Sequence, residues 1–157
     1  MNKLLVMGMA LLSVLCFSAC GHEDGPAENI KGTYIVSRTI TMDVPPEYMF
    51  EPQYHEVKLV VKAENENFVN ITLPAASYVL NGQTMDMPSF TINNIPVLDD
   101  GMDGGVIRDH SFQQKAGKKD VVGSIDGEIE DDGDLELTVK FKYGSMPFSM
   151  TQKFKSL

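Results

Sequence analysis

The chain has 157 residues, of which 43% are hydrophobic and 22% are charged, and its formal net charge at pH 7 is -9. This length is that of a single globular domain once the N-terminus is set aside. The acidic balance excludes nucleic acid as a partner, because the chain has no basic stripe that would contact phosphates.

The first predicted element is an N-terminal leader. Lys3 is followed by an apolar run, 4–17, which is too short to span a bilayer as a helix and has the length of a secretory signal. The run ends in Phe17-Ser18-Ala19-Cys20-Gly21, which resembles a bacterial lipobox, where small residues precede a cysteine that is acylated. The alternative is an ordinary secretory peptide with a chance cysteine. We expect a cleaved lipoprotein signal peptide over residues 1–19 and a lipidated, flexible tether over 20–31.

Acylation of Cys20 would hold the protein at a membrane, since two or more buried acyl chains anchor stably. Gly21 follows this cysteine in place of the aspartate that retains enteric lipoproteins at the inner membrane, so we expect an outer-membrane lipoprotein of the cell envelope. The pair Glu23-Asp24 resembles the acidic export tag of surface lipoproteins, which leaves surface exposure open. Both cysteines lie in the leader, so the mature domain has no disulfide and no thiol nucleophile.

Residues 32–44 form the first predicted strand, because apolar and polar side chains alternate along it. Arg38 falls in the apolar row, where a cation either extends out past a bulge or rim or sits in a cavity beside a partner. The next segment, 45–52, has three prolines and no period, yet it carries Tyr48 and Phe50. Such a loop either covers an exposed edge or forms a lid over a ligand.

Two long strands joined by a tight turn follow a strand at 56–62. Asn81-Gly82 is typical of a type I′ hairpin and sets Tyr78 opposite Met85. Pro74 and Pro88 interrupt these two strands and either bend them, which gives about eight strands in all, or end them, which gives about ten. We expect eight strands and no helix.

The last third of the chain predicts a three-stranded meander. Apolar and polar residues alternate strictly over 135–143. A three-residue loop ending in Gly133 puts Ile129 opposite Leu135 and Ile125 opposite Val139. The next turn, Gly144-Ser145, suits a two-residue type II′ hairpin that would place Phe141 opposite Phe148 and Val139 opposite Met150. The fold class is therefore all-β, an antiparallel up-and-down barrel of about eight strands over residues 32–157.

No catalytic centre, cofactor or metal site is predicted. The acidic loop 99–105 lacks the spacing of an EF-hand, and we expect it to be solvated. His22, His55 and His110 are scattered along the chain and none has metal-ligand spacing. No serine lies in a nucleophile-elbow context, and no segment matches a phosphate-binding loop. We therefore expect a protein that is not an enzyme.

Several short segments spread over the mature domain resemble the calycin-like (lipocalin-like) domain family of Gram-negative lipoproteins. They are Ile71-Thr72-Leu73-Pro74, Met87-Pro88-Ser89-Phe90, Ile95-Pro96-Val97, Gly123-Ser124-Ile125-Asp126-Gly127 and Lys142-Tyr143-Gly144-Ser145-Met146-Pro147-Phe148. Gly32-Thr33-Tyr34 is similar to the lipocalin Gly-x-Trp signature, with tyrosine in place of tryptophan. The resemblance implies an antiparallel barrel of about eight strands that binds small apolar ligands. The chain departs from lipocalins in having no tryptophan and no C-terminal helix.

The interior of this barrel is the predicted ligand site. Methionine and aromatic side chains would form its wall, with the loop at 45–52 beside it, and two polar residues that interrupt the inward rows, Arg38 and Gln152, would anchor the ligand. The expected wall and loop residues are Tyr48, Phe50, Tyr78, Met85, Met87, Phe141, Phe148 and Met150. Two alternatives stay open: a barrel filled by its own side chains, and a surface module whose loops bind a protein or glycan partner.

Overall fold

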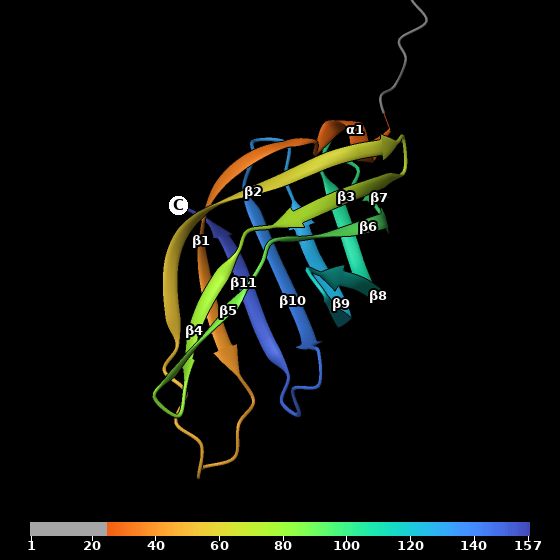
Figure 1. The fold of residues 1–157 in the computed structure, drawn as a ribbon. Coiled ribbons are helices and arrows are strands. Elements are labelled where there is room, and N and C mark those ends of the chain that lie inside the picture. The colour runs from red at the N-terminus through yellow and green to blue at the C-terminus, as the bar shows by residue number, and fades with distance from the viewer. Residues whose placement is uncertain (1–24) are drawn as a thin grey trace, which may run out of the picture.

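Consecutive strands of this protein follow one another around a barrel (Figure 1). The computed structural model describes residues 25–157. They form one short helix, α1 (Pro26–Asn29), and the strands β1 (Gly32–Met42), β2 (Gln53–Asn65), β3 (Phe68–Leu73), β4 (Ala76–Leu80), β5 (Gln83–Met87), β6 (Phe90–Pro96), β7 (Leu98–Asp99), β8 (Gly105–Ala116), β9 (Lys119–Ile129), β10 (Leu135–Tyr143) and β11 (Met150–Ser156). The predicted signal peptide, Cys20 and the start of the tether lie outside the described residues.

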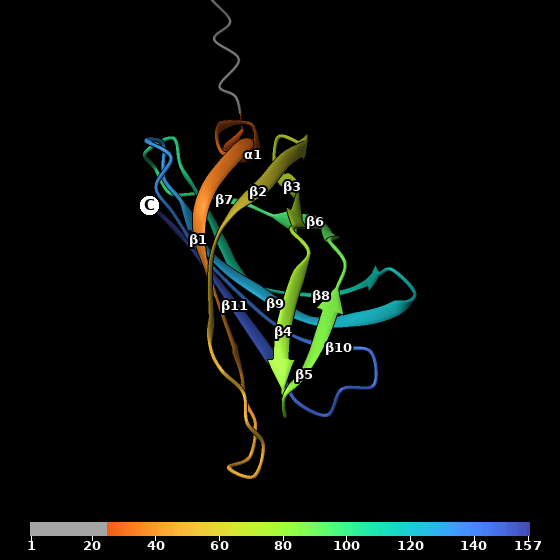
Figure 2. The same cartoon turned by 60° about the vertical axis from the view of Figure 1, so that its left-hand side comes forward.

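Nine strands form one antiparallel sheet in the order β6-β3-β2-β1-β11-β10-β9-β8-β7. Most neighbours in this order are also neighbours along the chain, which makes the topology up-and-down. The pairing of β1 with β11 places Val36 opposite Ser156 and Met42 opposite Met150. The opening and closing strands therefore lie side by side (Figure 2), and the predicted antiparallel barrel is confirmed.

The two edges of the sheet meet without a backbone ladder between β6 and β8 in the described part of the chain. Side chains bridge this seam instead. Asn93 Nδ2 donates to Gln114 Oε1 over 3.2 Å, and the ring centroids of Phe90 and Phe112 are 6.3 Å apart. The barrel is therefore nearly closed by its backbone, and side chains complete it.

The β9–β10 hairpin has the predicted register. Leu135 pairs with Ile129 and Val139 with Ile125, and Gly133 in the loop has a positive φ of 91°. The apolar row of β10 is buried throughout, while the alternate side chains point to solvent or are half-buried. Strict alternation and a turn glycine were sufficient to determine this pairing.

The predicted register of β10 with β11 is wrong by two residues. Phe141 pairs with Met150, where Phe148 was expected, and Val139 pairs with Gln152. A shift of two residues leaves each side chain on its original face, because side chains alternate with a period of two. The apolar row of β11 therefore still points into the barrel.

The shift originates in the connection between the two strands. Met146 N donates to Tyr143 O over 3.3 Å, so a tight turn does form at the predicted place. Gly144 N, however, donates to Asp120 O over 2.7 Å and so extends the ladder with β9 past the end of β10. Pro147 has no N–H to contribute to a ladder. The chain thus needs a longer loop, 144–149, before β11 begins.

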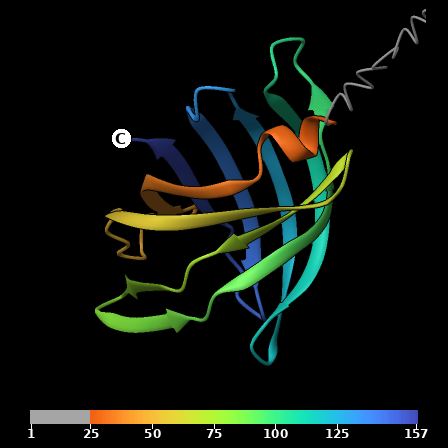
Figure 3. The same cartoon turned by 90° about the horizontal axis from the view of Figure 1, so that it is seen from above.

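The β3–β4 and β5–β6 segments are the two arms of one long hairpin. Leu73 pairs with Phe90 in the main sheet, and Ala76 pairs with Met87 in the separate β4–β5 sheet, so the same register continues across the break. The break contains Pro74 and Pro88, which interrupt the ladder without shifting it. Counted in this way, the main sheet has eight long strands and the two-residue β7, which agrees with the expectation of about eight. Figure 3 shows the β4–β5 arm extending beyond β3 and β6.

The expectation of no helix is wrong, because α1 lies within the segment assigned to the tether. Ala27 and Ile30 have 0% and 1% of their surface exposed, and Ala27 N donates to Glu66 O over 3.1 Å. Pro26 at the start of α1 suits a first helical turn, where its missing N–H needs no partner. The chain therefore packs onto one end of the barrel from Pro26 onward. In residues 25–157 no helix has the length and hydropathy that crossing a membrane requires.

One apolar core fills the space between the strands. It includes side chains from every long strand of the main sheet and from the β4–β5 hairpin. The pairings of all strands and this core lie within residues 25–157, so we expect this part of the chain to fold on its own.

Candidate functional site

Three segments gather at the end of the barrel opposite α1 (Figures 1 and 2). They are the β1–β2 loop, the β4–β5 hairpin and the β10–β11 loop. Their side chains form an aromatic and methionine group, which we call the mouth cluster: Tyr48, Phe50, Tyr78, Met85, Met146 and Phe148. Four other predicted ligand residues thus lie beside Tyr78 in this cluster, although the cluster draws on three separate segments. They are Tyr48, Phe50, Met85 and Phe148.

Ring contacts hold the mouth cluster together. Tyr48 and Phe148 meet edge to face at 4.7 Å between centroids, and Phe50 lies 6.4 Å from the Tyr78 ring. The Tyr78 hydroxyl donates to Met146 Sδ over 3.6 Å, and burial raises the pKa of this phenol, which keeps it neutral. Met146 was not among the predicted residues, although the expected hairpin placed it in the same inward row as Phe148.

The β1–β2 loop covers the tip of the hairpin. Asn81 N donates to Met49 O over 2.9 Å, and Met49 N donates to Asn81 Oδ1 over 2.9 Å. Phe50 and Leu80 form an isolated antiparallel bridge. These contacts make the loop a cover over the hairpin tip, which is compatible with both roles considered for it, and they place its aromatic side chains at the mouth.

The middle of the barrel is filled by side chains. Met150 has no exposed surface, and Met87 and Phe141 are each 1% exposed. A side chain without accessible surface touches no space large enough for a water molecule. Ile40 and Ile71 also have no exposed surface. The predicted inner wall therefore divides into a packed middle and a mouth cluster whose members, apart from Tyr78, are half-buried.

Arg38 lies in the interior at the level where the hairpin departs from the main sheet. It is 4% exposed, and its Nη1 donates to the carbonyls of Pro74 and Ala75 over 3.2 and 3.0 Å. Its Nε has no hydrogen-bond partner. No carboxylate within residues 25–157 forms an ion pair with this guanidinium, and burial lowers its pKa. Of the two alternatives for this residue, the interior position is the one observed.

Gln152 is the second polar group of the interior. It is 0% exposed, its Oε1 has no partner, and its Nε2 makes only a 3.8 Å contact with Met150 Sδ. The register places Gln152 opposite Ile40 and Arg38 opposite Phe154, so the two polar side chains are diagonal neighbours on the inner face of β1 and β11. The two predicted polar anchors are thus neighbours in the register, while the Gln152 amide contacts Met150 and forms no hydrogen bond with Arg38.

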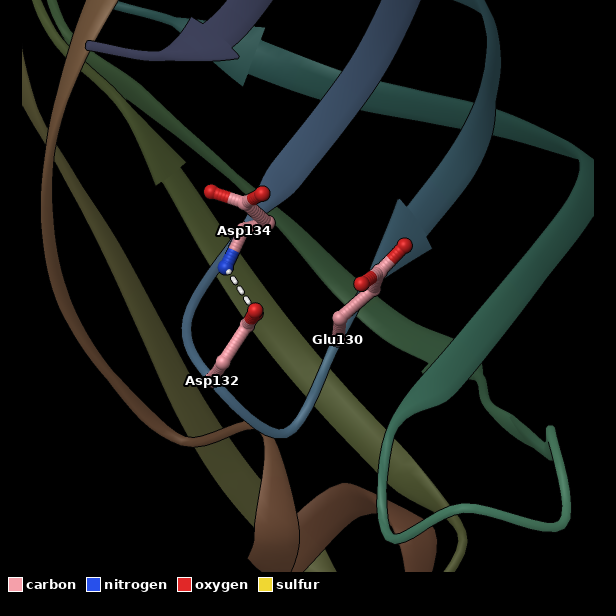
Figure 4. Close-up of side chains that lie close together, drawn as sticks. All are labelled: Glu130, Asp132 and Asp134. Atoms are coloured by element: carbon pink, nitrogen blue, oxygen red, sulfur yellow. Dashed lines mark hydrogen bonds between the residues drawn. The ribbon is translucent and has the colours of Figure 1, made fainter.

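A group of acidic side chains occurs at the other end of the barrel, in the β9–β10 loop (Figure 4). Carboxylate oxygens of Glu130, Asp132 and Asp134 lie within 4.8 Å of one another, and all three residues are exposed. The negative charge of Asp132 contributes most to raising the pKa of Glu130, and the other neighbouring carboxylates raise it further. Sequence reasoning missed this group, although its alternating acidic residues around a glycine turn were visible. Asp132 Oδ1 accepts from Asp134 N over 2.9 Å, so part of the group already supports the turn.

The acidic loop 99–105 uses its carboxylates in a similar way. Asp99 Oδ1 accepts from Gly101 N over 2.7 Å, and Asp100 Oδ1 accepts from Met102 N and Gly104 N over 2.7 and 3.0 Å. These bonds to backbone N–H groups stabilise the loop itself.

Comparison with known proteins identifies the fold. A family model described as a calycin-like beta-barrel domain matches residues 31–156. No curated protein matches the chain. A crystal structure of a putative outer membrane protein from Bacteroides fragilis NCTC 9343 superposes with a TM-score of 0.67 at 20% sequence identity, over 85% of this chain and 52% of that one. This chain thus spans about half of that protein, and the similarity concerns the fold alone. Because the family model covers most of the chain, the protein belongs to the calycin-like β-barrel domain family.

Proposed function

We propose that this protein binds a small amphipathic molecule at the mouth of its barrel and performs no catalysis. The observation that carries the proposal is the pair Arg38 and Gln152, two buried polar side chains of the barrel interior that each retain an unpartnered atom. A few polar groups below an apolar opening are typical of small-molecule sites.

Energetics favour a functional reason for this pair. A buried polar atom without a partner costs about 1–3 kcal/mol, and a buried cation without a counter-charge costs more unless it is otherwise paired. Folding alone gains nothing from the unpartnered Arg38 Nε and Gln152 Oε1. A ligand that hydrogen-bonds to both atoms would recover this cost on binding.

The mouth cluster suits the apolar part of such a ligand. Met85 and Met146 are half-buried and have flexible, polarizable side chains that adapt to irregular shapes. Since Phe141 and Met150 are packed between the β10–β11 loop and Gln152, the head group of the ligand would have to displace side chains of this layer as well as those of the mouth cluster to reach the polar pair.

A displacement assay tests this function. The neutral probe N-phenyl-1-naphthylamine, titrated into residues 25–157, is expected to fluoresce on binding and to be displaced by dodecanoate. Met85→Glu is expected to weaken probe binding about tenfold, because a charge in the apolar mouth must be desolvated. Thr84→Glu is the matched control, since Thr84 is exposed on the same strand and points the other way. Absence of probe binding, or equal loss in both variants, would contradict the proposal.

We further propose that acyl chains on Cys20 anchor the protein to the outer membrane. The support is the lipobox-like leader and the fold similarity to a protein described as a putative outer membrane protein. Five residues lie between Cys20 and Pro26, and these six steps along the chain span at most about 22 Å. Because α1 and the mouth lie at opposite ends of the barrel, this anchor would direct the mouth away from the bilayer. Mass spectrometry of the membrane-extracted protein is expected to find Cys20 as an acylated N-terminus; an unmodified N-terminus at another residue would contradict it.

The packed middle of the barrel favours a second candidate, a surface module that binds a protein or glycan partner. Met49 and Tyr54 are 71% and 73% exposed near the mouth and would contribute to such a surface. Under this alternative, dodecanoate displaces nothing, and Tyr54→Ala weakens partner binding while Met85→Glu leaves it unchanged.

A further inference from the structure

One half of β2 has a neighbouring strand on only one side. β1 pairs with β2 from Gln53 to Val61, whereas β3 begins to pair with the other side of β2 only at Val60. β4 continues the chain beyond β3 but pairs with β5 alone, and Figure 2 shows it diverging from β2. Residues 53–59 therefore have no ladder partner on this side within residues 25–157. We call this stretch the β2 edge.

The direction of the backbone groups along the β2 edge follows from the strand registers. Asp43 N donates to Ser149 O over 3.0 Å, and the two residues lie opposite each other when the β1–β11 register is continued by one residue. Backbone groups point alternately to the two neighbouring strands, so even-numbered residues of β1 face β2. Arg38 pairs with His55, which means that odd-numbered residues of β2 face β1 and even-numbered ones face away. The residues whose N–H and C=O groups face the β2 edge are Tyr54, Glu56 and Lys58.

A proline explains why the ladder between β2 and β3 stops. If this register continued, Pro74 would lie opposite Lys58. Pro74 has no N–H to donate to the Lys58 carbonyl, and its own carbonyl accepts from Arg38 Nη1 over 3.2 Å. The two segments form a bridge again only at Phe50 and Leu80, just before β2 begins. The β2 edge is thus bounded at both ends, and only a short strand fits beside it.

Solvent reaches the β2 edge. Tyr54 is 73% exposed. His55 lies opposite Arg38, which places its side chain in the inner row of β2, yet it is exposed. Further along the same row Leu59 is 0% exposed, because β3 begins to cover the wall there. Unpaired N–H and C=O groups that are open to solvent can pair with the backbone of an added strand. The chemistry of the edge therefore suits an extended peptide segment.

The outer side chains of the β2 edge limit which segment fits. Glu56 and Lys58 are exposed, carry opposite charges and form no ion pair within residues 25–157. Opposite charges that face each other across two strands stabilise the pairing, and like charges destabilise it. A complementary antiparallel segment therefore has an acidic residue opposite Lys58, followed two residues later by a basic residue opposite Glu56.

A second copy of this chain does not meet these conditions. Pairing Glu56 with Lys58 of the second copy would bring Tyr54 of that copy opposite Val60, where β3 already pairs. A register centred on Glu56 would set two glutamates against each other, and one centred on His55 would leave both charges without an opposite charge. The β2 edge therefore favours a segment of a different protein.

We propose that the β2 edge binds a short extended segment of another protein, antiparallel to β2, with an acidic residue opposite Lys58 and a basic residue opposite Glu56. The proposed interaction is on the side wall of the barrel and does not depend on the ligand proposed for the mouth.

Two peptides of equal composition provide the first test. Acetyl-Glu-Val-Arg-Val-Thr-amide has the proposed order of charges, and acetyl-Arg-Val-Glu-Val-Thr-amide has the reverse order. In an NMR titration of isotope-labelled residues 25–157, the first is expected to bind about tenfold more tightly, because both cross-strand charge pairs are favourable. The amide signals expected to shift most are those of Tyr54, Glu56 and Lys58. Equal affinities, a preference for the reversed peptide, or absence of binding would overturn the inference.

A charge exchange on β2 locates the preference. The double variant Glu56→Lys with Lys58→Glu is expected to prefer the reversed peptide about tenfold, because the order of charges on the edge is inverted. Glu128→Lys with Lys142→Glu makes the same exchange on β9 and β10, which have partners on both sides, and is expected to keep the wild-type preference. A wild-type preference in the folded β2 variant would contradict the assignment.

Removal of one backbone donor tests the pairing itself. Glu56→Pro deletes an N–H that faces the β2 edge and leaves the hydrogen bonds between β2 and β1 in place. It is expected to abolish peptide binding, while circular dichroism and thermal unfolding establish that the variant is folded. If it does not fold, a peptide methylated at the backbone nitrogen of its arginine replaces it and is expected not to bind. Binding of the peptide to folded Glu56→Pro, or of the methylated peptide to the wild type, would overturn the inference.

Two further measurements separate this proposal from its alternatives. Sedimentation of residues 25–157 alone is expected to show a monomer; a dimer that Glu56→Pro dissociates would assign the β2 edge to a second copy and overturn the inference. Binding of N-phenyl-1-naphthylamine is expected to be the same in the wild type and in the β2 charge-exchange variant. Loss of peptide binding with intact probe binding would therefore count against the β2 edge alone and not against the mouth.

Discussion

Phe141→Ala is expected to lower the free energy of unfolding of residues 25–157 by about 3–5 kcal/mol. Phe141 is 1% exposed near the C-terminal end of β10, and its ring meets the Phe90 ring edge to face with 5.6 Å between the centroids. Truncation would remove both the buried area and this ring contact, and strands paired on both sides of β10 limit how far the cavity can collapse. Urea unfolding with an unchanged m-value measures the loss.

Lys142→Ala is the control for this prediction, because Lys142 is the next residue on β10 and its side chain is exposed. Its effect is expected to stay within about 0.5 kcal/mol. A loss below about 1 kcal/mol for Phe141→Ala would mean that the middle of the barrel has room to rearrange. The middle of the barrel would then not be tightly packed.

Gly123→Ala is expected to destabilise the barrel by about 2–3 kcal/mol through overpacking. Gly123 pairs directly with Phe141. A Cβ atom at this position would lie 2.1 Å from Lys140 O and 2.5 Å from Phe141 Cβ, so backbone atoms of β10 would have to move. Thermal and urea unfolding of the same residues measure the effect.

The matched control is Gly32→Ala, a glycine that also lies in a strand. A Cβ on Gly32 would find its nearest atom at 3.5 Å, in the Tyr34 ring, which is an ordinary contact. We expect a change within about 0.5 kcal/mol. Equal losses for the two glycines would contradict a cause that lies in the contact with β10.

The two hairpins of the closing meander show what a sequence pattern does and does not determine. Along 129–135 the loop has one glycine at the required position and no alternative length, so the predicted register is correct. Along 144–149 the same kind of reasoning fails by two residues. Alternation determines which face of the sheet each side chain occupies. It does not distinguish two registers that differ by two residues. The contact of Gly144 with Asp120 decides the loop length, and that contact belongs to a different strand pair.

For the candidate site, the sequence identified the polar residues but not their environment. Arg38 and Gln152 were recognisable because each interrupts an apolar row, and the pairing of β1 with β11 brings them together. The carbonyls that Arg38 contacts could not be predicted, because they become free only where Pro74 and Pro88 interrupt the hairpin. The short helix α1 was missed because four residues are too few for a periodic signal.

The amino-acid sequence by itself determined that this protein is an antiparallel barrel, which strands neighbour each other and which side chains point inward, because turn residues and a period of two are local properties of the chain. Only the tertiary structure decided that the middle of the barrel is filled, that an open apolar cluster is confined to one end, and that Arg38 and Gln152 retain unpartnered atoms. Those properties depend on how side chains from distant strands occupy a shared volume, and no local pattern specifies that volume.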